Sequence, residues 1–252
     1  MKIAIPSLAT LCAGLIAAFF IGFLYPVEKI SDDPNYIKTM PDFESYTDVN
    51  KKKEDFFNFL LPRVKAANNK IREERSWLLE LNPDKLSNND QARLTELADK
   101  YEVDDASNNS EIIEVLKRRI DVIPASLVLA QAANESAWGT SRFAKQGNNL
   151  FGQWCYVKGC GLVPMQRQTN ERHEVAKYDD IQGSIESYMR NLNAQFSYAD
   201  FRTKRAILRK NNKSISGIKL AEGLLKYSTR REAYVHEIQA MIKQNNLSRL
   251  DP

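Results

Sequence analysis

The sequence predicts a mainly α-helical protein whose helices follow an apolar N-terminal segment. Beyond residue 50, apolar residues recur at spacings of three and four, the period of an amphipathic helix. One short stretch, residues 161–178, instead has the pattern of a small β-hairpin that turns at Thr169-Asn170. Gly and Pro number 10 and 9 among 252 residues, which excludes collagen-like and low-complexity chains.

The apolar segment runs from Ile3 to Val27, and these 25 residues carry no charge. A helix of about 20 apolar residues crosses a bilayer. Lys2 and the terminal amine precede the run, so the positive-inside bias keeps the N-terminus in the cytoplasm. We therefore expect residues 1–27 to be an uncleaved transmembrane anchor in the inner membrane, with the remainder in the periplasm. A cleaved signal peptide or a buried core helix would be the alternatives.

Two cysteines, Cys155 and Cys160, lie beyond this segment. An even pair in an exported chain predicts a disulfide. A zinc site would need more ligands, since only His173 is near, and we expect no metal and no other cofactor. A hydrolase built on Cys155 and His173 stays open as a different reading of the same residues.

The charged residues divide the chain into an acidic-leaning and a basic half. The first 120 residues hold 17 Lys and Arg against 20 Asp and Glu, and the remainder holds 19 against 12. Polar residues 28–50 predict a linker. Residues 51–120 predict a helical stalk, or a wrap around the second half, and residues 121–248 a separate domain. The helices expected in the first half are residues 51–81, which Pro62 should kink or restart, then 84–100 and 110–120.

The basic half opens with an Ala-rich helix, from Pro124 to about residue 138, that is apolar nearly all round and should be buried. Its one carboxylate is Glu135. Burial of a carboxyl group disfavours the ionised form and raises the pKa, so glutamate is seldom fully buried without a partner. A protonated glutamic acid is what a glycosidase uses to protonate its leaving oxygen. Glu135 on an exposed stripe, or paired with Arg142, is the alternative. Later helices are expected at residues 181–195, 198–210, 216–225 and 231–244.

Two motifs carry a resemblance to a known family. Ala-Gln-Ala-Ala-Asn-Glu-Ser-Ala-Trp-Gly surrounds Glu135, and Asn-Asn-Leu-Phe-Gly follows at residues 148–152. Together they resemble the bacterial endo-β-N-acetylglucosaminidases of glycoside hydrolase family 73, which include the flagellar rod peptidoglycan hydrolase domain. Gly-Thr-Ser-Arg-Phe-Ala, the cysteine loop and His-Glu-Val look closest to the Bax-type, membrane-anchored members. The resemblance covers about residues 120–245.

The resemblance implies a lysozyme-like α domain with a small β-lobe and a groove between them. Glu135 corresponds to the family's general acid, and Tyr227 to a tyrosine that faces the groove, although a core tyrosine explains Tyr227 equally well. The second carboxylate belongs in the hairpin, where Glu171 and Glu174 both qualify, and we favour Glu174. Either could also be a solvated surface charge. An inverting mechanism and a substrate-assisted one both stay open.

The expected substrate is peptidoglycan, cleaved after N-acetylglucosamine. Its carboxylates would attract the basic half, whereas export and the lack of a motif argue against nucleic acid. The rivals are a lytic transglycosylase or muramidase on the same scaffold, and a non-catalytic wall-binding module. The substrate-binding residues predicted from these motifs are Trp138, Asn149, Phe151 and Trp154, of which Trp138 is also explained as a core residue.

Overall fold

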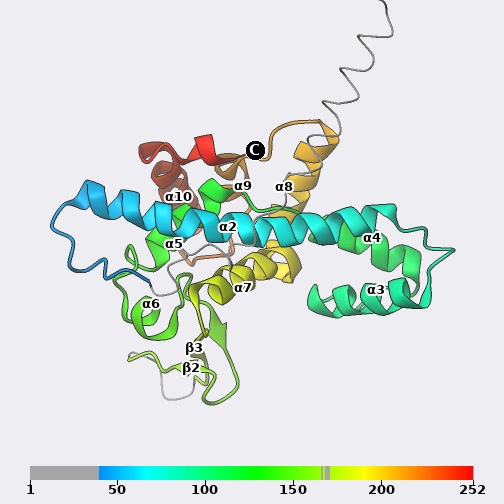
Figure 1. Cartoon of the computed structure of the whole chain (residues 1–252), viewed down its shortest axis with the longest axis horizontal. Coiled ribbons are helices and arrows are strands. Elements are labelled where there is room, and N and C mark those ends of the chain that lie inside the picture. Colours follow the sequence, from blue (N-terminus) through cyan, green and yellow to red (C-terminus); the bar gives the residue numbers. More distant parts are fainter. Residues whose placement is uncertain (1–39, 166, 168–170, 252) are drawn as a thin grey trace, which may run out of the picture. The chain divides into compact units, whose positions relative to one another are not determined.

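The computed structural model describes residues 40–165, 167 and 171–251. Within them the chain is mainly helical and has one small three-stranded sheet, which confirms the predicted fold class at this level (Figure 1). The predicted anchor, residues 1–27, and the first part of the linker lie outside the described residues. Among the residues that are described, no helix is both long and apolar enough to cross a membrane.

The first described helix, α2 (Val49–Glu80), is continuous over 32 residues. Asp48 caps it by accepting hydrogen bonds from the backbone of Asn50 and Lys51. The restart expected at Pro62 does not occur. Proline removes one helical hydrogen bond, but buried residues on both sides of it hold the helix against the core. These buried residues are Phe56, Phe59, Leu60, Arg63, Val64, Ala67, Asn68, Ile71 and Leu78.

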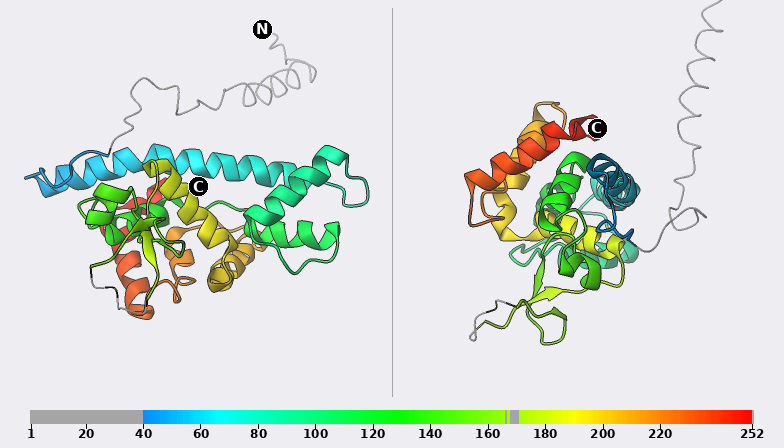
Figure 2. Two further views of the ribbon diagram at one scale, coloured as in Figure 1. Left: turned by 90° about the horizontal axis from the view of Figure 1, so that it is seen from below. Right: turned by 90° about the vertical axis from the view of Figure 1, so that its left-hand side faces the viewer.

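The next two helices, α3 (Asn88–Lys100) and α4 (Asn109–Arg119), pack on each other, and α4 also packs on α2. Ser87 and Asp90 form a capping box at the start of α3. Helix α2 packs in turn against α5 and α7, as the views of Figures 1 and 2 agree. The acidic-leaning half therefore shares a core with the helices that follow it.

Helix α5 (Ala125–Glu135) lies at the centre of this core, as its all-round apolar pattern predicted. Every residue from Ala125 to Ala133 is buried, and the helix contacts α2, α9, α10 and η3. Its N-terminus is capped from the far end of the chain. Asp251 accepts from the Ser126 backbone at 3.0 Å and from the Ser126 hydroxyl at 2.7 Å. A carboxylate at this end also complements the helix dipole.

The four helices expected after residue 180 are present. The predicted stretch at 216–225 is helical only over α9, and a short 3-10 helix precedes α8. The elements that follow α5, apart from the strands, are α6 (Arg142–Gly147), α7 (Ile181–Ala194), η2 (Phe196–Tyr198), α8 (Ala199–Lys210), α9 (Gly217–Ala221), α10 (Glu232–Gln244) and η3 (Leu247–Leu250).

The small sheet has the strand order β1-β3-β2, with both pairings antiparallel. Its strands are β1 (Trp154–Cys155), β2 (Gly161–Leu162) and β3 (Glu174–Ala176). The pairing of β2 with β3 confirms the predicted hairpin, whose turn lies outside the described residues. Strand β1 was not predicted, because two residues are too few to show an alternating pattern. A Cβ at Gly161 would lie 2.0 Å from the Val175 carbonyl oxygen, so β2 requires glycine there.

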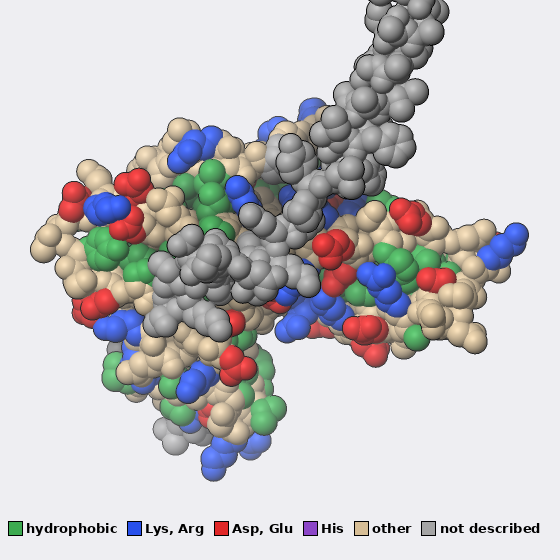
Figure 3. Space-filling view, viewed as in Figure 1, with side chains coloured by type: hydrophobic (Ala, Val, Ile, Leu, Met, Phe, Trp, Pro, Cys, Tyr) green, Lys and Arg blue, Asp and Glu red, His purple; other side chains and the backbone are tan. Residues whose placement is uncertain are grey.

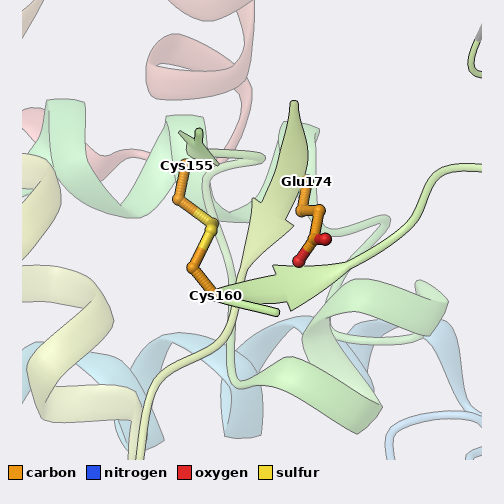
Figure 4. Close-up of side chains that lie close together, drawn as sticks. All are labelled: Cys155, Cys160 and Glu174. Carbon is orange, nitrogen blue, oxygen red and sulfur yellow. A yellow bond between two sulfur atoms is a disulfide. The ribbon is translucent and has the colours of Figure 1, made fainter. Parts of the chain in front are cut away.

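The predicted disulfide is confirmed. Cys155 and Cys160 are bonded, with their Cα atoms 6.2 Å apart. Figure 4 shows the bridge next to Glu174, which is the register partner of Cys155 on β3. The bridge therefore closes the loop between β1 and β2.

Candidate active site

Glu135 is the last residue of α5, and a tight turn follows it. Ala137, Trp138 and Gly139 have φ values of 51°, 59° and 78°, in the left-handed region. Residues other than glycine rarely adopt this conformation, and it persists where the surroundings impose it. Here the Ser136 hydroxyl donates to the Ala132 carbonyl at 2.6 Å and accepts from the Gly139 backbone at 2.8 Å. The turn stops α5 at the residue that carries the carboxylate.

The carboxylate of Glu135 is half-buried and is held by hydrogen bonds without a cation. Its Oε1 accepts from the Tyr234 hydroxyl at 2.7 Å and from the Asn134 amide at 3.3 Å. Arg142, the alternative partner expected from the sequence, donates instead to the Val163 carbonyl at 2.8 Å. No Lys, Arg or His in the described part of the chain forms an ion pair with Glu135.

The charge of Glu135 acts on four tyrosines. Burial, and to a smaller extent this negative charge, raises the pKa of each of them, to about 12 for Tyr198. They therefore remain neutral hydrogen-bond donors at ordinary pH. The four are Tyr188, Tyr198, Tyr227 and Tyr234.

Tyr227 belongs to both the core and this cluster. Its ring stacks on Tyr234 with the centroids 5.3 Å apart, and its hydroxyl donates to the Phe151 carbonyl at 3.0 Å. Phe151 in turn stacks on Tyr188 at 3.9 Å. The residue predicted to face the groove thus lies against the tyrosine that bonds Glu135, and it fixes the loop before β1.

Glu174, the favoured second carboxylate, is 5% exposed and engaged by backbone groups. Its oxygens accept from the Gly159 backbone at 3.0 and 3.1 Å and from the Gly161 backbone at 2.9 Å. These hydrogen bonds lower the pKa of the Glu174 carboxyl group. They anchor the disulfide loop to β3, which gives Glu174 a structural role (Figure 4). Its predicted catalytic role stays a prediction.

The other hairpin carboxylate, Glu171, is exposed, and its Oε2 lies 3.8 Å from Nδ1 of His173.

A second group of side chains has the spacing of a metal site. The possible ligand atoms of Cys155, Cys160 and Glu174 lie within 4.8 Å of one another, a spacing that suits a metal ion. Because both sulfur atoms are in the disulfide, they do not offer the thiolates that zinc requires.

Of the predicted sugar-stacking aromatics, Trp154 presents an exposed ring. It is 57% exposed and stacks on the His173 ring at 4.0 Å. Trp138 packs instead on Phe56 and Phe57 of α2, with centroids 5.5 and 5.3 Å away, in agreement with its explanation as a core residue.

Phe151 and Asn149 are placed to support the loop that precedes β1. Phe151 is 3% exposed, so its ring is not presented to solvent. The buried Asn149 amide donates to the carbonyls of Gln153 at 3.0 Å and Ala176 at 2.8 Å. Their predicted contact with substrate stays a prediction, and the structure adds this supporting role.

Sequence reasoning missed Tyr234, Gln131 and Tyr188, which stand behind Glu135. A signal for Gln131 was present: it is a polar residue on a helix that is apolar nearly all round, four positions before Glu135. Tyr188 and Tyr234 lie on other helices, and only the packing of α7 and α10 brings them near α5.

Comparison with known proteins shows that the chain is a glycoside hydrolase. Residues 110–247 match the glucosaminidase family model, described as mannosyl-glycoprotein endo-beta-N-acetylglucosaminidase. The chain therefore belongs to the glucosaminidase family, which confirms the family resemblance read from its motifs.

The chain is similar to two known proteins. The chain is 32% identical to Protein bax of Escherichia coli (strain K12) over 209 residues, which are 82% of this chain and 74% of that protein. Among solved structures, it is similar to the catalytic domain of the autolysin Auto from Listeria monocytogenes. That match has 17% identity and a TM-score of 0.44, and it covers 99% of this chain and 100% of the other.

Proposed function

We propose that this protein hydrolyses the glycan strands of peptidoglycan after N-acetylglucosamine, with Glu135 as the proton donor. The observation that carries the proposal is the setting of Glu135. It ends a buried helix, is half-buried itself, and accepts hydrogen bonds from a neutral phenol and an amide. Among the residues that the structure describes, no cation is paired with it. A carboxyl group in such a position can give a proton to a leaving glycosidic oxygen. The motifs around it are those that resemble peptidoglycan glucosaminidases.

In the proposed reaction, Glu135 lies in a lysozyme-like groove and gives its proton to the bridging oxygen while the bond to the anomeric carbon breaks. Two routes can then complete hydrolysis. Either a second carboxylate activates water, or the carbonyl oxygen of the sugar's N-acetyl group bonds to the anomeric carbon and water later opens that intermediate. Three backbone hydrogen bonds make Glu174 a weaker base. Its contacts therefore favour the substrate-assisted route.

Digestion of purified peptidoglycan with the full chain tests this function. Mass spectrometry should find saccharides that end in reducing N-acetylglucosamine. Predominantly anhydromuramic ends would contradict the proposal and support a lytic transglycosylase. Intact glycan strands with retained binding would support the non-catalytic wall-binding module.

Two matched variants test the second carboxylate. If the route is substrate-assisted, Glu174→Gln should keep more than a tenth of the rate in assays on folded protein, and Glu171→Gln should do the same. A loss of about a hundredfold or more in either variant would assign that residue as the base.

We also propose that residues 1–27 anchor the protein in the inner membrane and that the rest of the chain lies in the periplasm. The charge-free length of 25 residues supports an anchor. The Cys155–Cys160 disulfide supports an oxidising compartment. Protease added to spheroplasts should degrade the chain beyond the anchor, and the uncleaved protein should fractionate with the membrane. Full protection from protease would contradict this location.

A further inference from the structure

Three buried polar side chains form a chain of hydrogen bonds that ends on Glu135. The Tyr188 hydroxyl donates to Oε1 of Gln131. The Gln131 amide nitrogen donates to the Tyr234 hydroxyl oxygen at 2.8 Å. Tyr234 then donates to Oε1 of Glu135 at 2.7 Å. Tyr188, Gln131 and Tyr234 are each at most 1% exposed, so water does not compete for these bonds.

The donors and acceptors fix the direction of this chain. A phenol carries a single proton. Because the Gln131 amide donates to the oxygen of Tyr234, the Tyr234 proton points to Glu135. Gln131 and Glu135 lie four residues apart on α5, so they share one face of the helix. Since Oε1 of Glu135 is the acceptor, an acidic proton on this residue lies on Oε2.

We propose that Tyr234, oriented by Gln131, is a positioning residue that holds Oε1 of Glu135 and directs the acidic proton to Oε2. Tyr188 completes the arrangement by fixing the orientation of the Gln131 amide. The inference rests on the proposed role of Glu135 as the acid. A hydrogen bond to an ionised carboxylate is stronger than one to the neutral acid, so a titration of the wild-type protein and of a variant without the Tyr234 hydroxyl should differ.

The tyrosines on which the charge of Glu135 acts do not titrate in the same pH range as a carboxyl group. This charge raises the pKa of four phenols: Tyr188 on α7, Tyr198 in η2, Tyr227 before α10 and Tyr234 on α10. Burial raises the pKa of each, so none of them titrates near neutrality. Within the described residues, no Lys, Arg or His is ion-paired to Glu135.

The direct test is a carbon NMR titration of the glutamate carboxyl groups in the full chain, with Glu135→Gln to assign the resonance. Tyr234→Phe keeps the ring that stacks on Tyr227 and removes the donor. The carboxyl resonance of Glu135 should then titrate at higher pH than in the wild-type protein, because the hydrogen bond to the carboxylate is lost. Gln131→Met, of similar size, should move this titration in the same direction, because the Tyr234 proton is then free to turn away.

Tyr101→Phe is the matched control. The buried Tyr101 hydroxyl donates to Oε2 of Glu74 at 2.6 Å, which is the same kind of pair away from the site. This variant should leave the titration of Glu135 unchanged. An unchanged titration in folded Tyr234→Phe overturns the positioning role, as does an equal shift in Tyr101→Phe. If Tyr234→Phe does not fold, Gln131→Met alone decides between the two results.

The pH profile of hydrolysis gives a second readout. In Tyr234→Phe, the alkaline limb of kcat/KM should move to higher pH by the same amount, and kcat should fall about tenfold to a hundredfold with little change in KM. Suppose that Tyr234→Phe shifts the titration of Glu135 but Glu135→Gln still hydrolyses glycan strands at the full rate. The contact between Tyr234 and Glu135 would then be supported and the proposed function overturned. An unshifted titration with an inactive Glu135→Gln would overturn the positioning role and leave the proposed function standing.

Discussion

Replacing Asp121 with asparagine would test the buried charge network that joins the first half of the chain to the second. The Asp121 carboxylate is nearly inaccessible and accepts from Arg209 at 2.7 and 3.1 Å. Nε of Arg205 and Nε of Arg75 lie 3.8 and 3.9 Å from its oxygens. Burial by itself would raise the pKa of Asp121, but the hydrogen bonds from Arg209 and the charges of Arg205 and Arg75 lower it.

The expected cost follows from what the substitution leaves behind. Removing one partner of a buried ion pair costs about 3–5 kcal/mol. Arg205 is 1% exposed and keeps hydrogen bonds to backbone carbonyls, which offset part of the lost charge. Arg209 is 48% exposed, so solvent screens its share. We therefore expect a loss of about 3 kcal/mol in the free energy of unfolding, near the lower end of the range.

Urea unfolding of the full chain in mild detergent, followed by tryptophan fluorescence, would measure this loss. At a slope of about 2–3 kcal/mol per molar urea, the midpoint should fall by about 1–1.5 M. The control is Glu114→Gln, which removes an exposed pair with Lys117 and should cost less than about 1 kcal/mol. Equal losses in the two variants would refute the reasoning.

The pH dependence of the Asp121→Asn difference has a definite sign. The folded pKa of Asp121 lies below its unfolded value of about 3.9. Its stabilising contribution is therefore complete at neutral pH and is lost as the pH falls from about 3.9 through the folded pKa. Because asparagine does not titrate, the gap between the two proteins should close in that window. A gap that is constant from pH 7 to pH 3 would contradict this account.

Three further predictions concern the turn after α5 and the β-lobe. Cys155→Ser and Cys160→Ser should each lower the free energy of unfolding by about 2 kcal/mol, the value for a loop this short. Thermal unfolding of the full chain would measure this loss. If folded Cys155→Ser loses hydrolysis and Cys160→Ser does not, a cysteine nucleophile is favoured instead. Gly139→Ala should lower the free energy of unfolding by about 1–2 kcal/mol because φ at this residue is left-handed. The loss should be larger still because the new Cβ would lie 2.7 Å from the Phe43 ring. An unchanged unfolding temperature would argue against a rigid turn. Trp154→Ala should raise KM for glycan strands and leave unfolding almost unchanged, whereas an unchanged KM would remove this ring from the substrate site.

The helical core was predictable because its cause is local. The apolar periods of α2, α5, α7 and α10 reflect the faces that the structure buries. The continuity of α2 through Pro62 was not predictable, because the packing that holds it comes from helices later in the chain. The local rule predicted a kink or a restart at Pro62, and the restart does not occur.

The site was predictable in part for the same reason. Glu135 is conspicuous as the one carboxylate on an Ala-rich helix, and the short spacing of Cys155 and Cys160 indicated their disulfide. The backbone contacts of Glu174 depend on how the cysteine loop folds over β3, which no spacing encodes. The contact of Tyr234 with Glu135 joins residues 99 positions apart.

Part of the positive charge of the basic half is buried. The basic half carries 19 Lys and Arg against 12 Asp and Glu. Figure 3 shows side chains of both signs on one face of the molecule. Some of this positive charge is buried within the fold, as Arg205 and Arg202 show. The surface of the basic half therefore carries less positive charge than its count of Lys and Arg suggests.

The most direct test of the central claim is the rate of glycan hydrolysis by Glu135→Gln on purified peptidoglycan. Glutamine keeps an acceptor for the Tyr234 hydroxyl and removes the acidic proton, so the fold should persist. Glu96→Gln, on an exposed face of α3, is the matched control. Glu135 as the general acid predicts a loss of about a hundredfold to ten-thousandfold in kcat, with wall binding retained and the control unaffected. Hydrolysis by Glu135→Gln at the wild-type rate would contradict the claim.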